Sequence, residues 1–333
     1  MTENPIFTPP YPLKTAVLFL VFNRLDTTTQ VFEAIRNAKP PRLYVAADGP
    51  RFSKEGEPEK VQAVRDYVLE HIDWDCEVKT LFRDENLGCK YAVSSAITWF
   101  FENEEMGIIL EDDVLPLPSF FYYCDELLER YKDNESIALI SGCNMISRYY
   151  EPASSYFFSK YNFIWGWASW RRSWREYDVR MAQWPAWKAL GVLRDLSDGN
   201  RFFSMYWGAF FDKVHAGHID TWDFQWTFAC WRKGAVSVLP KYNLVSNLGF
   251  SRADATHTTG EIPGVFIHSV QKNIDFPMCH PESIVRSCDA DRLVDKLGYS
   301  ISFGSALKRV MQDMPCVRNL LKKIKQISFS NSH

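Results

Sequence analysis

The chain has 333 residues, 46% of them apolar and 24% charged, a balance typical of a globular protein with one large or two modest domains. Its 38 basic and 41 acidic residues leave a formal charge of −3, so no overall attraction for nucleic acid is expected. The longest apolar run, residues 16–22, is far shorter than the roughly 20 residues that span a bilayer. The first residues lack a signal-peptide pattern, and the 8 cysteines include no C-x-x-C pair. We therefore expect a cytoplasmic protein without disulfides or a zinc site.

Strand and helix signals alternate over the first 140 residues. Apolar strand patterns occur at 15–22, 43–47, 77–81, 106–110 and 137–140. Helical spacing follows Asp26, a candidate N-cap, and Pro58, a candidate helix start, and also Asn86 and Phe120. Strands separated by single helices predict a mainly parallel sheet with helices on both faces, and thus an α/β fold resembling the Rossmann arrangement.

The alternation stops near residue 145, where a tryptophan-rich region begins. Ten of the 12 tryptophans lie between Trp165 and Trp231, and one more strand is predicted at 235–239. Large aromatic faces suit a packed core and also suit sugar rings, so Trp165 and Trp167 are candidate sugar platforms with the core as the alternative.

The C-terminal segment 303–333 is predicted to be an appended helix with one apolar face. That face is formed by Leu307, Val310, Met314, Val317 and Leu321. Six Lys and Arg residues accompany one acid, Asp313, in the stretch 308–325. A solvated helix and a helix that contacts anionic lipid both explain this pattern.

Acidic residues follow two of the predicted strands, where parallel sheets bind their ligands. Asp48 ends the second strand, and Glu111-Asp112-Asp113 ends the fourth. The loop after the first strand, Asn23-Arg24, contains neither a dinucleotide-binding glycine motif nor a P-loop, and no G-x-S-x-G elbow occurs. Dinucleotide-dependent dehydrogenases, P-loop phosphotransferases and α/β-hydrolases are therefore disfavoured.

The acidic triplet predicts a divalent metal site. Residues i and i+2 of an extended segment point the same way, so Glu111 and Asp113 are expected to face one ligand and Asp112 another. Carboxylate oxygens suit Mg²⁺ or Mn²⁺, which bind phosphates jointly with one or two protein carboxylates and neutralise a departing diphosphate. Three adjacent acids at the end of a buried strand need a cation to offset their repulsion.

The ordered set of motifs resembles glycosyltransferases of the nucleotide-diphospho-sugar transferase superfamily, which have the GT-A fold, and in particular family-2-like bacterial members. The motifs in question are Asn23-Arg24, Asp48-Gly49, Asn86-Leu87-Gly88 and Glu111-Asp112-Asp113. Residues 110–121 are similar to the E-D-D region of the N-acetylglucosaminyltransferase that initiates complex N-glycans. Segments 166–174, 222–226 and 247–258 are similar to those of a bacterial branch of this superfamily. The resemblance covers roughly residues 14–260.

The resemblance implies roles for the residues that match it. Asp48 would bond the nucleobase, Asn23, Arg24 and Lys90 would line the donor pocket, and Asp113 would bind the metal directly. Glu111 and Asp112 would lie near the ribose and the donor sugar, with Trp165 and Trp167 as further donor contacts. Position 111 holds Glu rather than the Asp of a D-x-D motif, a variation found in the relatives named.

Two later residues match catalytic positions of that family. Asp223 would be the base that deprotonates the acceptor, and its place between Trp222 and Trp226 predicts a poorly solvated carboxylate with a raised pKa. The alternative for Asp223 is an ion pair with Arg171, Arg172 or Arg175. His257 would be a second metal ligand or a diphosphate contact, with an ordinary core or surface histidine as the alternative.

The expected activity is therefore the metal-dependent, inverting transfer of a sugar from a nucleotide-diphosphate donor, with a UDP-sugar as first candidate. The acceptor would be a carbohydrate or lipid-linked glycan in bacterial surface polysaccharide synthesis. Residues 1–145 would bind the nucleotide sugar, 146–260 would form the acceptor half of the same domain, and 261–333 would be a C-terminal extension touching the inner face of the membrane. A non-catalytic carbohydrate-binding protein and a sugar nucleotidyltransferase remain alternatives, although the latter normally has a glycine-rich phosphate loop.

Overall fold

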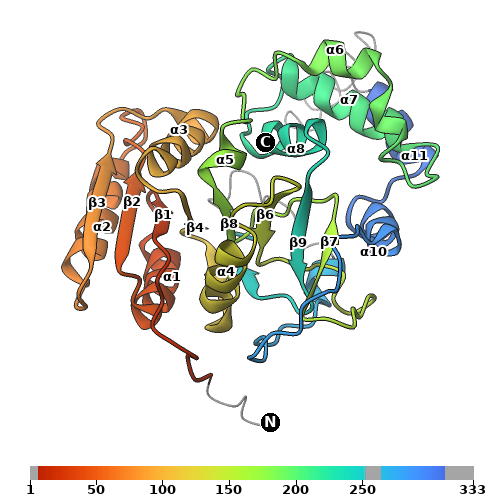
Figure 1. Ribbon diagram of the computed structural model, residues 1–333. Helices are drawn as coiled ribbons and strands as arrows, with labels where there is room; N and C mark the ends of the chain where they lie inside the picture. The colour runs from red at the N-terminus through yellow and green to blue at the C-terminus, as the bar shows by residue number, and fades with distance from the viewer. Residues whose placement is uncertain (1–6, 251, 253–263, 312–333) are drawn as a thin grey trace.

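The computed structural model describes residues 7–250, 252 and 264–311, and these residues build a central eight-stranded sheet. The strand order is β3-β2-β1-β4-β8-β6-β9-β7 (Figure 1). The sheet strands are β1 (Val17–Val21), β2 (Arg42–Ala47), β3 (Glu77–Phe82), β4 (Met106–Glu111), β6 (Ile137–Ser141), β7 (Tyr156–Ser159), β8 (Trp167–Trp170) and β9 (Val236–Pro240). Strands β7 and β8 run opposite to the others, so the sheet is mainly parallel.

Helices cover both faces of this sheet and extend beyond one end of it. The helices of the described ranges are α1 (Leu25–Ala38), α2 (Glu57–Glu70), α3 (Gly88–Asn103), α4 (Ser119–Arg130), α5 (Arg171–Trp174), α6 (Trp184–Ala189), α7 (Phe203–His215), α8 (Asp223–Arg232), α9 (Gly264–Ile267), α10 (Cys288–Leu293) and α11 (Phe303–Met311), with single turns η1 (Val192–Arg194) and η2 (Val294–Gly298). Figure 1 shows α6, α7 and α11 grouped with α8, away from β3. The predicted α/β class is confirmed, including the helical C-terminal extension as far as residue 311.

The alternation of side chains along the strands separates two apolar cores. In β1, Val17, Phe19 and Val21 pack on the face covered by α1, α2 and α4. Leu18 and Leu20 point to the opposite face, which α3 and α8 cover. Every residue of β1 is buried, as a parallel strand between two helical layers requires.

The start of α1 differs from the prediction. Arg24 is the N-cap residue, and Asp26 lies in the first turn. Asp26 instead accepts an ion pair from Arg252, and its negative charge still favours the positive end of the helix. The predicted start of α2 at Pro58 is confirmed, because proline occupies its first turn.

The tryptophan-rich region contributes to both apolar cores. Of the ten tryptophans from Trp165 to Trp231, nine are buried and Trp165 is partly exposed. Trp167 lies 6.0 Å from Trp222 and 6.1 Å from Trp226, measured between ring centroids. The buried tryptophans are divided between the two apolar cores. Trp167, Trp174, Trp222 and Trp226 lie in the core covered by α3 and α8, and the others lie in the second core.

A short antiparallel pair follows the acidic triplet. β5 (Val114–Pro116) pairs with β10 (Val245–Asn247), and the Leu248 N–H donates to the Asp113 carbonyl over 2.7 Å. This pairing brings a late segment of the chain to the end of β4. Among residues 7–250, 252 and 264–311, no helix combines the length and apolar character needed to cross a membrane.

Candidate functional site

The acidic triplet lies beside the loop that follows β1, because β1 and β4 are parallel neighbours and end together. Leu20 pairs with Glu111 at the last position of the ladder. The Asp112 carboxylate accepts a hydrogen bond from the Phe22 N–H over 3.2 Å. The guanidinium of Arg24 donates to Asp113 Oδ2 over 3.0 Å. The structure thus brings Arg24 and the acids together, and the roles of these residues toward a donor stay predictions.

Burial and mutual repulsion dominate the electrostatics of the triplet. Burial, reinforced by the charge of Asp113, raises the pKa of Asp112 to about 7. Burial and then the charges of Asp113 and Asp112 raise the pKa of Glu111 well above its usual value. Burial also raises the pKa of Asp113, while the Arg24 guanidinium opposes that shift. The triplet therefore carries less than its formal charge near neutral pH, and Arg24 offsets part of the remainder.

Asp48 anchors the loop that begins α3. Its carboxylate accepts hydrogen bonds from Asn86 Nδ2 over 2.9 Å, from the Leu87 N–H over 3.0 Å and from the Gly88 N–H over 3.1 Å. Gly88 has a φ of +74°, which favours glycine. These contacts use most acceptor positions of the carboxylate, so Asp48 fixes the loop before α3. Its contact with a nucleobase stays a prediction.

We expect Asp48→Ala to lower the free energy of unfolding by about 1–2 kcal/mol, because the first N–H groups of α3 lose their acceptor. Urea unfolding measures this loss. Asp84→Ala, which removes an exposed acid from the same loop, is the matched control and should change stability by less than about 0.5 kcal/mol. Equal stability of Asp48→Ala and the native chain would contradict the anchoring role.

Asp223 is the first residue of α8, one of the helices that cover the face of the sheet opposite to α1. One of its carboxylate oxygens, Oδ1, accepts hydrogen bonds from the Thr221 hydroxyl and, over 2.9 Å, from the Phe224 N–H. Burial, followed by the charges of Glu111 and Asp223, raises the pKa of the Cys89 thiol. The Asp223 charge also raises the pKa of Glu111. Glu111 and Asp223 are therefore close enough to interact electrostatically with each other and with Cys89.

Two of the arginines considered as alternative partners of Asp223 bind elsewhere. Arg171 forms an ion pair with Glu105 over 2.7 Å. Arg172 donates to the backbone carbonyls of Lys132, Ile137 and Tyr131. Ion pairs with these two arginines therefore do not explain the position of Asp223.

Asn23 and Lys90 also lie near this edge of the sheet. Asn23 Nδ2 donates to Glu57 Oε1 over 3.0 Å, and Glu57 is buried and paired with Arg51. Lys90 lies in the first turn of α3, with its ammonium 5.5 Å from the centroid of the Tyr91 ring. Their contacts with a donor stay predictions.

The two candidate aromatic platforms have different environments. Trp165 is partly exposed and packs edge-on against Phe266 and Phe250, with centroid distances of 4.8 Å and 5.5 Å. Trp167 has an exposed fraction of 0% inside the aromatic core. The prediction of Trp167 as a donor contact is therefore wrong in this structure, because no face of its ring is open to a sugar. His257 lies outside the described residues.

Two residues at this edge were missed by the sequence reasoning. The Cys89 thiol lies among the charges of Glu111, Asp223, Asp220 and Asp48, which all raise its pKa. Asp220 is exposed, and a Cβ built on Gly88 would lie 3.8 Å from its carboxylate. The sequence position of each residue could have indicated it. Cys89 directly follows the Asn86-Leu87-Gly88 motif, and Asp220 lies three residues before Asp223.

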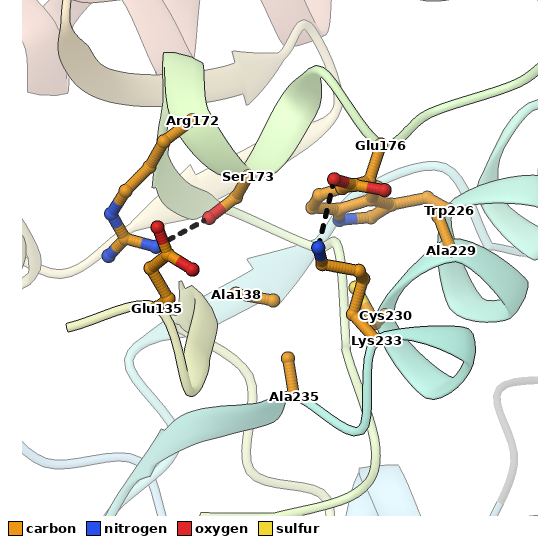
Figure 2. A pocket seen from close by; sticks show the side chains of 10 residues that line it. All are labelled: Glu135, Ala138, Arg172, Ser173, Glu176, Trp226, Ala229, Cys230, Lys233 and Ala235. Carbon is orange, nitrogen blue, oxygen red and sulfur yellow. Dashed lines mark hydrogen bonds and ion pairs between the residues drawn. The ribbon is translucent and has the colours of Figure 1, made fainter.

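A separate pocket with a volume of about 80 Å³ lies at the opposite edge of the sheet, near the starts of β6 and β9 (Figure 2). It is lined by Glu135, Ala138, Arg172, Ser173, Glu176, Trp226, Ala229, Cys230, Lys233 and Ala235. Figure 2 shows its polar groups paired with one another: Glu176 with Lys233 at 3.1 Å, and Arg172 with Ser173 at 3.1 Å. The acids at the end of β4 do not line it. We therefore place the candidate site at the acidic edge.

The described residues contain no group of three or more His, Cys, Asp or Glu side chains that could hold a metal ion by itself. Asp113 still offers hard carboxylate oxygens and is 16% exposed. That donor set fits Mg²⁺ or Mn²⁺ only where substrate oxygens or water complete the coordination, as is usual for these ions at phosphates. A divalent ion at Asp113, shared with a phosphate-bearing ligand, stays a prediction.

No family model and no curated protein matches the chain. Among solved structures, HddC from Yersinia pseudotuberculosis is 10% identical, with a TM-score of 0.30 over 47% of this chain and 77% of that one. HddC complexed with GMP-PN gives 12% identity and a TM-score of 0.29 over the same shares. The glycosyltransferase GlyE from Streptococcus pneumoniae TIGR4 is 12% identical, with a TM-score of 0.27 over 56% of this chain and 39% of that one. Likenesses this distant say nothing about activity.

Proposed function

We propose that this protein is a glycosyltransferase that moves a sugar from a nucleotide-diphosphate sugar to a carbohydrate or lipid-linked acceptor. The main support is one arrangement: the acids at the end of β4 meet Arg24 from the loop after β1, and Glu111 interacts electrostatically with Asp223 from α8. Carboxylates and a guanidinium at the carboxyl edge of a mainly parallel sheet suit a charged, polyhydroxylated ligand. The ordered motifs described above favour the same activity.

Asp223 is the proposed base for an inverting displacement. Its carboxylate would accept the proton of the acceptor hydroxyl while that oxygen forms a bond to the anomeric carbon. The bond between the anomeric carbon and the diphosphate oxygen breaks on the other side of the sugar, and the nucleoside diphosphate leaves with the bonding electrons. The electrostatic interaction between Glu111 and Asp223 supports this assignment, because the donor sugar would lie between them.

Asp113 is the proposed metal ligand, and Mg²⁺ or Mn²⁺ is the proposed ion. A bound ion of this kind neutralises the charge that develops on a departing diphosphate. Asp113 would hold it through one carboxylate, while Asn23, Arg24 and Lys90 contact the nucleotide. His257 is retained as a proposed additional ligand.

Incubating the protein with Mn²⁺ and a panel of UDP-, GDP- and dTDP-sugars tests the proposed activity. Slow hydrolysis or transfer that releases the nucleotide from one donor is the expected result. A carbohydrate-binding protein would bind glycans and release no nucleotide from any donor. A nucleotidyltransferase would instead release pyrophosphate from a nucleoside triphosphate and a sugar phosphate, so both alternatives give a distinct product.

The exposed face of α11 supports a further proposal, peripheral contact with an anionic membrane. Phe303, Leu307 and Met311 are exposed at a spacing of four residues, and Lys308 is exposed beside them. Ala306 is fully buried, so the helix is docked on its other side. The sequence that follows adds Arg318, Lys322, Lys323 and Lys325 against Asp313. An apolar stripe flanked by basic residues suits the headgroup region of anionic lipid.

We expect the protein to co-sediment with vesicles of phosphatidylcholine and phosphatidylglycerol and to stay in solution with phosphatidylcholine alone. The double change Leu307→Ser and Met311→Ser should weaken binding about tenfold or more, because two apolar side chains lose their burial in lipid. Leu69→Ser on α2 is the control, since Leu69 is 41% exposed and Leu307 is 37% exposed. Equal sedimentation with both vesicle types would contradict the proposal.

A further inference from the structure

We infer that Arg24 controls access of the divalent ion to Asp113. In the ligand-free protein its guanidinium occupies the carboxylate that the ion needs, and a diphosphate draws it away. The inference rests on the proposed function, because it assumes that Asp113 is the metal ligand. It adds a positioning role for Arg24 that couples the two binding events.

The ion pair between Arg24 and Asp113 is sheltered from solvent. Its atoms are 3.0 Å apart, and the two side chains are 14% and 16% exposed. Water and salt screen a pair in such a position less than they screen surface pairs. An ion that binds Asp113 must therefore displace the guanidinium from an ion pair that solvent weakens only partly.

The backbone of Arg24 is fixed while its side chain is long enough to change partners. Arg24 is the N-cap of α1, and its carbonyl accepts hydrogen bonds from the Thr28 N–H over 3.0 Å and the Thr28 hydroxyl over 2.6 Å. The guanidinium reaches from the end of β1 to the end of β4. Rotation about the bonds of this long side chain is the movement by which the guanidinium would leave Asp113.

Charge makes the ion and the guanidinium competitors at Asp113. A divalent cation on the Asp113 carboxylate would lie beside the positive charge of Arg24 and be repelled by it. A diphosphate supplies oxygens that a guanidinium binds in a bidentate manner. Diphosphate and metal therefore favour each other's binding, and by linkage the effect must be reciprocal.

The test measures the affinity of the protein for Mn²⁺ without any donor, with electron paramagnetic resonance of the free ion as the readout. Arg24→Gln should bind Mn²⁺ about tenfold more tightly than the native chain, because the competing charge is gone. Adding Asp113→Asn to Arg24→Gln should abolish that gain. Arg36→Gln is the matched control: it removes an arginine from the other end of α1, where Arg36 pairs with Asp73, and should leave Mn²⁺ affinity unchanged.

Equal Mn²⁺ affinity of Arg24→Gln and the native chain would overturn the inference, and so would the absence of Mn²⁺ binding to both. Arg24→Met removes the same charge and serves if Arg24→Gln does not fold. The shift in melting temperature on adding Mn²⁺, larger for either variant than for the native chain, is a second readout. None of these measurements uses a sugar donor, so their failure is distinct from a failure of the hydrolysis panel.

Discussion

Replacing Asp113 by alanine is expected to lower release of nucleotide from the active donor by about a thousandfold. The variant loses the carboxylate proposed to hold the divalent ion, and it frees the guanidinium of Arg24 from its 3.0 Å ion pair. Charge developing on the diphosphate would then lack its strongest stabilisation. Asp113→Asn should behave similarly, because the neutral amide is a poor ligand for Mg²⁺ or Mn²⁺.

Folding must be measured in the same preparations, since Arg24 is 14% exposed and the variant removes the Asp113 carboxylate that pairs with it. Circular dichroism and the melting temperature show whether the loss of activity follows from unfolding. Asp73→Ala is the control, because Asp73 also pairs with an arginine of α1 but is exposed. Nucleotide release by folded Asp113→Ala at the native rate would remove Asp113 from the mechanism.

Asp223→Asn is expected to retain donor binding and to lose between about 100-fold and 10,000-fold in transfer, the usual contribution of a general base. The amide has nearly the shape of the carboxylate and can still accept the Phe224 N–H, but it cannot take a proton from the acceptor. Donor affinity by calorimetry and the rate of transfer to an acceptor separate the two effects.

Asp289→Asn is the matched control for Asp223→Asn. Asp289 also lies in the first turn of a helix, α10, and its side chain is 83% exposed. The control therefore loses the same favourable charge at a helix N-terminus, which costs at most about 1 kcal/mol, and should keep full activity. A variant Asp223→Asn that transfers sugar as fast as this control would exclude Asp223 as the base.

Local sequence patterns predicted the strands β1, β2, β3, β4, β6 and β9 and the edge of the sheet that carries the acids. The apolar run 15–22 became β1 and the pattern 106–110 became β4, each within two residues at either end. A run buried on both faces can only be a strand between two layers, and parallel strands end at a common edge. Asp48 and the acids at the end of β4 therefore lie at the edge of the sheet that the sequence predicts.

The direction of β8 and the environments of the tryptophans were not readable from the sequence. β8 follows β7 after residues 160–166 and enters the sheet between β4 and β6 in the antiparallel sense. Trp165 and Trp167 are separated only by Gly166 in the sequence, yet Trp165 is partly exposed and Trp167 is fully buried. Which aromatic face is covered depends on α8 and its neighbours, which come from elsewhere in the chain.

The sequence by itself determined that charged groups gather where β1, β2 and β4 end. Hydrophobic periodicity marks the end of each strand in the local sequence, and neighbouring parallel strands end at the same edge of a sheet. Only the tertiary structure decided which partner each charge takes. The Asp48 carboxylate accepts hydrogen bonds from the loop before α3. Asp113, which follows β4, pairs with Arg24, which follows β1. Long side chains reach partners many residues away, and the free energy of each pair depends on burial that only the packed fold creates.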